Sequence, residues 1–166
     1  MTKCDKYVLD ANVFIEASRR YYAFDIAPKF WESLLTHAAN GRLCSVDRVL
    51  HELMQYDDQL ADWTKNCFRQ WFLSTQEQAV VQKYGQVMDW VYNHGGFTEP
   101  AKRDFAAGAD GWIVSYASVH ACVVVSQESF KLGIKRKVPI PNVCQQFGVP
   151  YIDTFKMMRS LGIVFR

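Results

Sequence analysis

The side chains best placed to do chemistry are the carboxylates of Asp10, Glu52, Asp110 and Glu128. Each falls where a strand is expected to end or a helix to begin, and in a doubly wound sheet such positions can converge on one edge. Clustered carboxylates repel one another unless a cation lies among them. Because the set contains no Cys or His, it predicts a hard ion, Mg²⁺ or Mn²⁺. An ion of this kind polarises a phosphoryl oxygen and lowers the pKa of its bound water, which suits phosphodiester hydrolysis.

Each of these residues also has a purely structural explanation. Asp is a favoured N-cap, so Asp10 and Asp110 could each simply begin a helix. Glu52 borders an apolar helix stripe and could be an ordinary surface glutamate. Glu128 lies in a polar turn of the kind that follows any strand. Single positions therefore leave both interpretations open, and it is the joint placement of the four that favours a site.

Other chemistries fit the sequence less well. The pair His51-Glu52 suggests a zinc peptidase, but that motif needs a second His where Gln55 stands. A phosphatase with Asp10 as nucleophile would need a second Asp two residues later, and Asn12 occupies that position. The glycines form no phosphate-binding loop, and no nucleophile elbow is present.

Composition sets broad limits. A formal net charge of +2 and a pI near 8.3 permit a local nucleic-acid patch without arguing for one. The five cysteines are scattered without C-x-x-C pairs, which argues against a disulfide framework or zinc knuckle. No apolar run approaches the ~18 residues of a membrane span, and the polar start of the chain resembles no signal peptide. We expect a cytoplasmic protein with a single domain over residues 1–166 and no membrane association.

The elements that must position the carboxylates follow from the apolar patterning. The run 121–126 is continuously apolar, as a central parallel strand should be. Strands alternating with helices predict an α/β fold with a mainly parallel sheet covered on both faces. The expected strands are residues 7–9, 43–46, 121–126 and 149–153, and the expected helices begin near residues 12, 28, 47, 57, 74, 99, 110, 141 and 154.

Helix boundaries can also be predicted from residue types. Asp47 and Thr154 are expected to cap the helices that follow them, and Ser74 with Glu77 forms a capping-box pattern. The middle of the chain, about residues 57–96, is expected to be helical throughout. The glycine at position 148 should end the helix before it.

A basic run, KLGIKRK, covers residues 131–137. Such runs are usually solvated loops, but one beside an acidic site could hold a phosphate backbone. The candidates for RNA contact are Lys131, Lys135, Arg136 and Lys137.

Together, the motifs YVLDANVFIEA, SVDRVLHEL, GADGWIVSYA and VVVSQES, in this order and spacing, resemble the PIN-domain family, which includes the ribonuclease toxins of toxin–antitoxin pairs. The resemblance implies a PIN-like three-layer α/β/α sandwich, here with an enlarged helical middle section. It matches Asp10, Glu52 and Asp110 to the family's acidic positions. Glu128 is a looser match, because Glu replaces Asp. Asn12 and Ser126 match polar supporting positions.

The same resemblance implies a function. PIN domains are Mg²⁺- or Mn²⁺-dependent endoribonucleases that leave a 5′-phosphate and a 3′-hydroxyl. It further implies an RNA substrate, an antitoxin partner and a homodimer, for which the abundant aromatic residues would suit an interface. The alternative is a PIN fold without catalysis that binds RNA or a protein.

Overall fold

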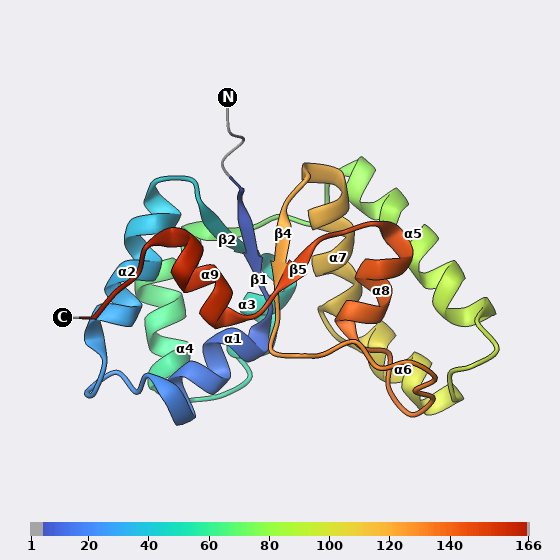
Figure 1. The fold of residues 1–166 in the computed structure, drawn as a ribbon, viewed down its shortest axis with the longest axis horizontal. Helices are drawn as coiled ribbons and strands as arrows, with labels where there is room; N and C mark the ends of the chain where they lie inside the picture. Colours follow the sequence, from blue (N-terminus) through green and yellow to red (C-terminus); the bar gives the residue numbers. More distant parts are fainter. Residues whose placement is uncertain (1–4, 166) are drawn as a thin grey trace.

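A central parallel sheet organises the computed structural model, which describes residues 5–165 (Figure 1). The sheet is five-stranded with the order β3-β2-β1-β4-β5, and every pairing between the described strands is parallel. The predicted α/β fold is confirmed. The strands are β1 (Tyr7–Leu9), β2 (Leu43–Val46), β3 (Phe72–Leu73), β4 (Val123–Val125) and β5 (Tyr151–Ile152).

Strand β1 lies in the middle of this sheet, and Tyr7 is in register with both Leu43 and Val123. Its residues and those of β4 are buried, which explains why both strands are continuously apolar. In Figure 1 the two strands run side by side and end at the lower edge. Residues that follow Leu9 and Val125 therefore emerge together.

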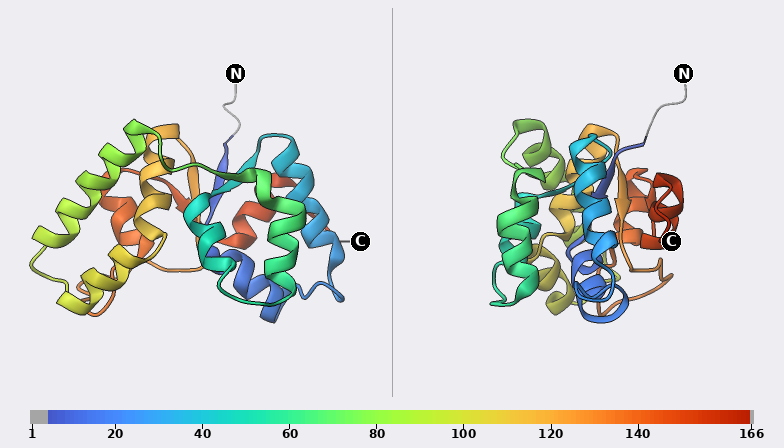
Figure 2. Two further views of the ribbon diagram at one scale, coloured as in Figure 1. Left: turned by 180° about the vertical axis from the view of Figure 1, so that it is seen from behind. Right: turned by 90° about the vertical axis from the view of Figure 1, so that its left-hand side faces the viewer.

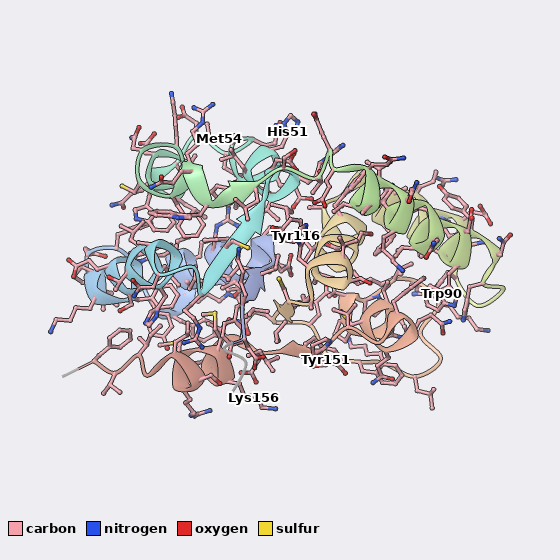
Figure 3. The ribbon with its side chains drawn as sticks, turned by 90° about the horizontal axis from the view of Figure 1, so that it is seen from above. His51, Met54, Trp90, Tyr116, Tyr151 and Lys156 are labelled. Atoms are coloured by element: carbon pink, nitrogen blue, oxygen red, sulfur yellow. The ribbon has the colours of Figure 1, made fainter. Side chains whose placement is uncertain are left out.

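Helices cover both faces of the sheet, as the three-layer prediction requires. In the edge-on view of Figure 2, α8 and α9 lie on one side and α4 and α5 on the other. Figure 3 likewise places His51 of α3 and Lys156 of α9 on opposite sides. The helices are α1 (Ala11–Glu16), α2 (Pro28–Ala39), α3 (Asp47–Leu53), α4 (Gln59–Trp63), α5 (Gln78–Asn93), α6 (Glu99–Ala107), α7 (Asp110–His120), α8 (Ile140–Phe147) and α9 (Thr154–Leu161).

The helical middle section differs from the prediction at β3. Phe72 pairs with Ser45 of β2, so a strand interrupts the stretch that was expected to be helical throughout. The π-helical turn Thr64–Phe68 and the 3₁₀ turn Arg69–Trp71 lead into it. A strand of two residues is too short to show the alternation that identifies strands, and the aromatic residues before it have helical spacing.

Three of the predicted helix caps are wrong. Helix α5 begins at Gln78, four residues after Ser74. Ser74 does not cap this helix, because its Oγ accepts a hydrogen bond from Gln76 N, which is outside the helix. Asp47 is the first residue of α3, and its carboxylate instead accepts bonds from the N–H and hydroxyl of Thr75. The final helix is capped by Asp153, which accepts from Lys156 N, and not by Thr154.

Other predictions for the ends of elements are confirmed. The carboxylate of Asp58 accepts from Ala61 N at the start of α4. Gly148 adopts a φ of 66° and ends α8 in the left-handed conformation that favours glycine.

Cys44, Cys122 and Cys144 are buried and Cys67 is exposed, while Cys4 lies outside the described residues. Within residues 5–165, no helix has the length and apolar character needed to cross a membrane.

Most aromatic side chains form a core rather than an exposed surface. The ring of Phe14 on α1 is fully buried and lies 5.6 Å from Phe68, 5.9 Å from Phe72 and 6.2 Å from Trp63. These contacts join α1 to the enlarged helical section. Only a few aromatic side chains are therefore exposed and could form the expected interface, among them Tyr92, Phe130 and Phe155.

Candidate functional site

Asp10 lies at the carboxyl end of the central strand and is only 2% exposed. Its N–H donates to the carbonyl of Val125 at 3.0 Å, which fixes the backbone where β1 and β4 end. The side chain makes no capping hydrogen bond to α1. Instead, Oδ2 accepts from Ser126 Oγ at 3.1 Å. A helix-cap explanation therefore does not account for this buried carboxylate.

The charge of Asp10 is destabilised by its surroundings. Burial, and then the nearby charge of Glu128, raise the pKa of Asp10 from 3.8 to about 7, and Glu52 adds to the effect. The hydrogen bond from Ser126 acts in the opposite direction but does not offset the burial. The molecule thus holds an acid in a place that favours its neutral form unless a cation is nearby.

Asp110 is the first residue of α7 and shares this environment. Burial raises the pKa of Asp110 well above its ordinary value, and the charges of Asp10, Glu128 and Glu52 raise it further. Because these effects fall off with distance, they show that the fold brings together all four carboxylates predicted from the sequence. They come from four separate segments: the ends of β1 and β4, helix α3 and the start of α7.

Glu52 joins helix α3 to the N-terminus of α7. Its Oε1 accepts a 2.7 Å hydrogen bond from the N–H of Ala109. A Cβ added to Gly108 would lie 3.3 Å from the same oxygen. Gly108 therefore makes room for the side chain of Glu52. Gly111 has another role, because its Cβ would lie 3.0 Å from the rings of Phe105 and Tyr84.

Two substitutions at Glu52 should separate the contribution of its hydrogen bond to stability from the contribution of its charge. We expect Glu52→Ala to lower the free energy of unfolding by about 1–3 kcal/mol, because it leaves the buried Ala109 N–H without a partner. Glu52→Gln keeps an accepting oxygen and should lose less than half as much. Urea denaturation of both variants in a chelator measures the difference. Equal losses would show that the hydrogen bond is not what Glu52 contributes.

Glu128 is held by a lysine and by a helix N-terminus. Its Oε1 lies 2.6 Å from Lys137 Nζ, and its Oε2 accepts from the N–H of Ile140, the first residue of α8, at 2.7 Å. The Glu128 N–H donates to Ser126 Oγ, the same oxygen that donates to Asp10. Ser126 therefore connects the carboxylate of Asp10 to the backbone of Glu128.

The sequence and the fold were compared with known proteins. The family model described as "Domain of unknown function (DUF4411)" matches residues 7–165. The chain belongs to the DUF4411 family. No curated protein matches its sequence closely enough to indicate a relative.

Solved structures show which fold this DUF4411 chain shares. One match is "Structure of FitAB bound to IR36 DNA fragment", with 17% identity, 89% of this chain and 94% of that chain covered, and a TM-score of 0.53. Another is "Crystal Structure of FitAcB from Neisseria gonorrhoeae", with 18% identity, coverage of 88% and 96%, and a TM-score of 0.52. At such low identity the likeness concerns the fold alone, and the predicted PIN-like fold is confirmed.

The basic run of the DUF4411 chain borders the carboxylates but is not uniform. Lys131, Lys135 and Arg136 are exposed on the loop between β4 and α8. Lys137 instead directs its ammonium at Glu128. Burial lowers the pKa of Lys137, but its hydrogen bond to Glu128 and the nearby charges of Glu128, Asp110 and Asp10 outweigh this and raise it. Of the residues expected to contact RNA, Lys137 is thus the one placed inside the acidic cluster.

The residue types at the cluster fit a hard divalent cation, since every donor is a carboxylate oxygen and the two aspartates are strongly desolvated. Across residues 5–165, however, no group of three or more His, Cys, Asp or Glu is already arranged to hold a metal ion. In this arrangement Glu52 is bound to Ala109, and Glu128 to Ile140 and Lys137.

The buried acids predict a pH dependence of the metal-free protein. Because the pKa of Asp10 is raised from 3.8 to about 7, its carboxyl holds a proton in the folded state that the unfolded state releases. The contribution of Asp10 to the free energy of unfolding should be complete below about pH 4 and should fall, by roughly a few kcal/mol, as pH rises to about 7. Urea denaturation in a chelator at several pH values measures this. Asp10→Asn should flatten the curve, and an unchanged slope in that variant would contradict the assignment.

One neighbouring feature escaped the sequence analysis. Beside Glu52 lies a cavity of about 310 Å³ lined by Arg48, His51 and Trp112, among others. The guanidinium of Arg48 lies 4.4 Å from the centre of the Trp112 ring, which stacks on Tyr84 at 3.7 Å. Arg48 precedes Glu52 by one helical turn, so helical spacing would have placed both on the same face of α3. Trp112 and Tyr84 are on α7 and α5, so no pattern within a single segment predicts that they stack beside Arg48.

Proposed function

We propose that the protein is a metal-dependent endoribonuclease whose metal ligands are Asp10, Glu52, Asp110 and Glu128. The observation that carries this proposal is the convergence of four carboxylates from separate segments at the carboxyl edge of the sheet. Burial and mutual repulsion raise the pKa values of Asp10 and Asp110 there. Such a cluster is stable in its charged form only with added positive charge, which Mg²⁺ or Mn²⁺ would supply.

The residues have separable roles in this proposal. Asp10 and Asp110 would be the fixed ligands, because Ser126 orients the buried Asp10 and the pKa of Asp110 is raised by desolvation and by its acidic neighbours. Glu52 and Glu128, which now accept backbone hydrogen bonds, would complete the ligand set. When bound, Mg²⁺ or Mn²⁺ polarises a phosphoryl oxygen and lowers the pKa of its water. Lys137 would then have its ammonium available for a phosphate oxygen, and Asn12, in the first turn of α1, would support Asp10.

The biological setting is part of the same proposal. The PIN-like fold shared with FitAB and FitAcB, together with the motif resemblance to ribonuclease toxins, supports a toxin of a toxin–antitoxin pair. An antitoxin protein and a second copy of the chain are then the expected partners, with RNA as the substrate. The exposed residues Lys131, Lys135 and Arg136 lie beside the cluster, where they would attract a phosphate backbone.

Incubation of single-stranded RNA with the purified protein tests the activity. We expect cleavage with Mn²⁺ or Mg²⁺, no cleavage with a chelator, and fragments that end in a 5′-phosphate and a 3′-hydroxyl. Cleavage that persists in the chelator, or fragments with a cyclic phosphate, would overturn the metal-dependent mechanism. A sample carrying Asp110→Asn controls for contaminating nucleases.

The alternative is a PIN-fold module that binds RNA or protein without catalysis. The observation in its favour is that Lys137 already supplies a cation to Glu128 at 2.6 Å. Titration calorimetry with Mn²⁺ distinguishes the two. Binding that is lost in Asp10→Asn supports the nuclease, whereas absence of Mn²⁺ binding to the unmodified protein supports the module.

A further inference from the structure

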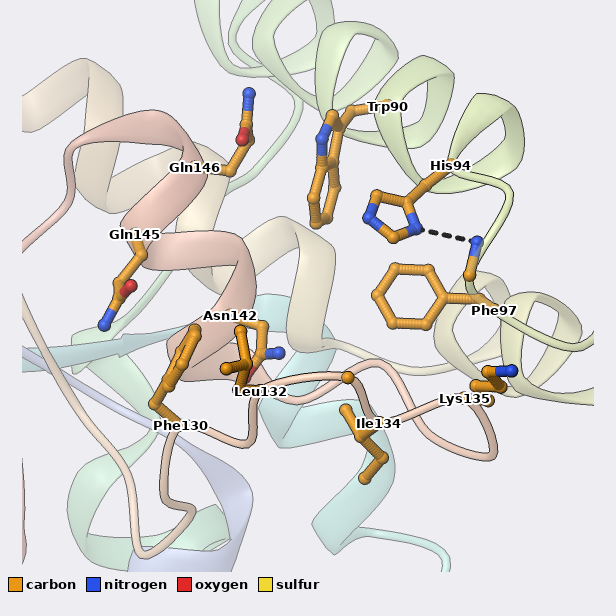
Figure 4. A pocket seen from close by; sticks show the side chains of 12 residues that line it. Trp90, His94, Phe97, Phe130, Leu132, Ile134, Lys135, Asn142, Gln145 and Gln146 are labelled. Atoms are coloured by element: carbon orange, nitrogen blue, oxygen red, sulfur yellow. Dashed lines mark hydrogen bonds between the residues drawn. The ribbon is translucent and has the colours of Figure 1, made fainter.

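A second cavity lies apart from the carboxylates, between the end of α5, the loop at residues 129–137 and α8 (Figure 4). Its volume of about 410 Å³ is within the ~300–1,000 Å³ typical of small-ligand sites. Trp90 and Phe97 form one wall, with Gln146 of α8 beside Trp90, and Phe130 and Leu132 lie opposite. Aromatic faces and side-chain amides therefore surround the same space.

The wall near Trp90 is preformed. The ring of Trp90 lies edge-on to His94 at 5.0 Å and to Phe97 at 5.8 Å, and His94 stacks on Phe97 at 4.6 Å. The Gly96 N–H donates to His94 Nδ1 at 3.1 Å, which orients the imidazole. A Cβ on Gly96 would lie 2.7 Å from His94 Cε1, so a side chain at this position would displace the imidazole. The aromatic wall is held by specific contacts.

The apolar side chains of the opposite wall are exposed to solvent. Phe130 is 38% exposed and Leu132 is 91% exposed. The loop that bears them is nevertheless fastened to α8, because the Asn142 amide accepts from Lys131 N at 3.0 Å and donates to Lys131 O at 2.9 Å. Large apolar side chains on a fastened loop are a usual mark of a binding surface.

The loop that lines this pocket continues into the acidic cluster. Ile134 lines both the pocket and a neighbouring cavity that contains Glu128 and Lys137. Lys137 in turn lines a further cavity with Asp110. Since Ile134 and Lys137 are three residues apart, their Cα atoms are at most about 11 Å from each other. The same short loop therefore borders both the pocket and the carboxylates.

We propose that the pocket receives an unpaired base of the RNA strand whose backbone is bound at the carboxylates. This inference rests on the proposed function. Aromatic faces stack on any base, Gln146 offers a donor and an acceptor for a base edge, and Lys135 at the rim is suited to a phosphate. A peptide ligand would explain the apolar side chains equally well, but not the lysines or the loop shared with the acidic cluster. Bases in a duplex are already stacked, so the strand must be single.

The test measures binding without cleavage. Fluorescence anisotropy follows a labelled oligouridylate of about 12 nucleotides in a chelator. We expect Phe130→Ala to weaken binding about 5- to 100-fold, because one stacked base is lost. Tyr92→Ala is the matched control, since this 46% exposed tyrosine is on α5 but outside the pocket. The affinity of this variant for the oligouridylate should be unchanged.

A second series uses oligonucleotides in which one base at a time is removed and the backbone is kept. At one position, base removal should weaken binding to the unmodified protein and have no further effect on Phe130→Ala, because both changes delete the same contact. Equal binding by the unmodified protein and Phe130→Ala, or equal binding of a duplex, would overturn the proposal and leave the pocket to a protein partner. Since no cleavage is involved, a protein without nuclease activity can still pass this test, and an active nuclease can fail it.

Discussion

Asp10→Asn abolishes Mn²⁺-dependent RNA cleavage and at the same time stabilises the metal-free protein: this is the result we expect from the geometry of the site. Removing the buried carboxylate removes a metal ligand, and activity should fall by at least about 10²–10³-fold, the scale of one lost preorganised electrostatic contact. The amide keeps an oxygen for Ser126 Oγ and carries no charge. At pH 8 in a chelator, the free energy of unfolding should rise by on the order of a few kcal/mol, since a desolvated charge is gone.

The paired outcome identifies the role of Asp10. A residue that only supports the fold would lose activity and stability together, whereas a metal ligand loses activity and gains stability without metal. Asp104→Asn is the matched control, because this exposed acid on α6 lines the cavity that contains Asp110. It should leave both quantities nearly unchanged. Full activity of Asp10→Asn, with Asp110→Asn equally active, would remove the basis of the proposed function.

Phe14→Ala should produce the largest loss of stability, about 3–5 kcal/mol in the free energy of unfolding. The ring is fully buried among Trp63, Phe68 and Phe72, so its removal leaves a cavity between α1 and the enlarged helical section. Total stabilities of folded proteins are roughly 5–15 kcal/mol, so this loss is a large share of the whole. Urea denaturation at 25 °C measures the effect.

Phe155→Ala is the comparison for that loss. This phenylalanine is 40% exposed on α9 and contacts Tyr21 at 6.1 Å. Its truncation should change the free energy of unfolding by less than about 1 kcal/mol. A similar loss in both variants would mean that the buried aromatic cluster does not dominate the packing around α1.

The sequence predicts the central strands of the sheet but not its edge at β3. Strands β1 and β4 are short, continuously apolar runs. A helix follows β1 and polar residues follow β4, so the pattern can be recognised within each segment alone. Phe72 and Leu73 belong to a strand only because Ser45 and Val46 of β2 lie beside them. Likewise, Asp47 binds Thr75 instead of capping α3, since a partner distant in sequence competes with the local backbone.

The same distinction applies to the site. Asp10, Glu52, Asp110 and Glu128 could be predicted because parallel strands deliver residues to one edge of the sheet, and this rule needs no side-chain coordinates. The bond from Glu52 to Ala109 and the ion pair of Lys137 with Glu128 depend on side-chain directions across different elements. The aromatic pocket likewise combines α5, α8 and the loop between β4 and α8, and no segment alone has its pattern.

The position of β1 in the sheet also sets when the site can form during synthesis. The first strand made is the central one, and it stays without its β4 neighbour until residues 123–125 have been added. Asp10 meets Ser126 across 116 positions of sequence, so a nascent chain carries Asp10 long before Ser126 has been added. Contacts between residues this distant in sequence form late in folding. The carboxyl edge of the sheet, where Asp10 lies, is therefore completed only near the end of synthesis.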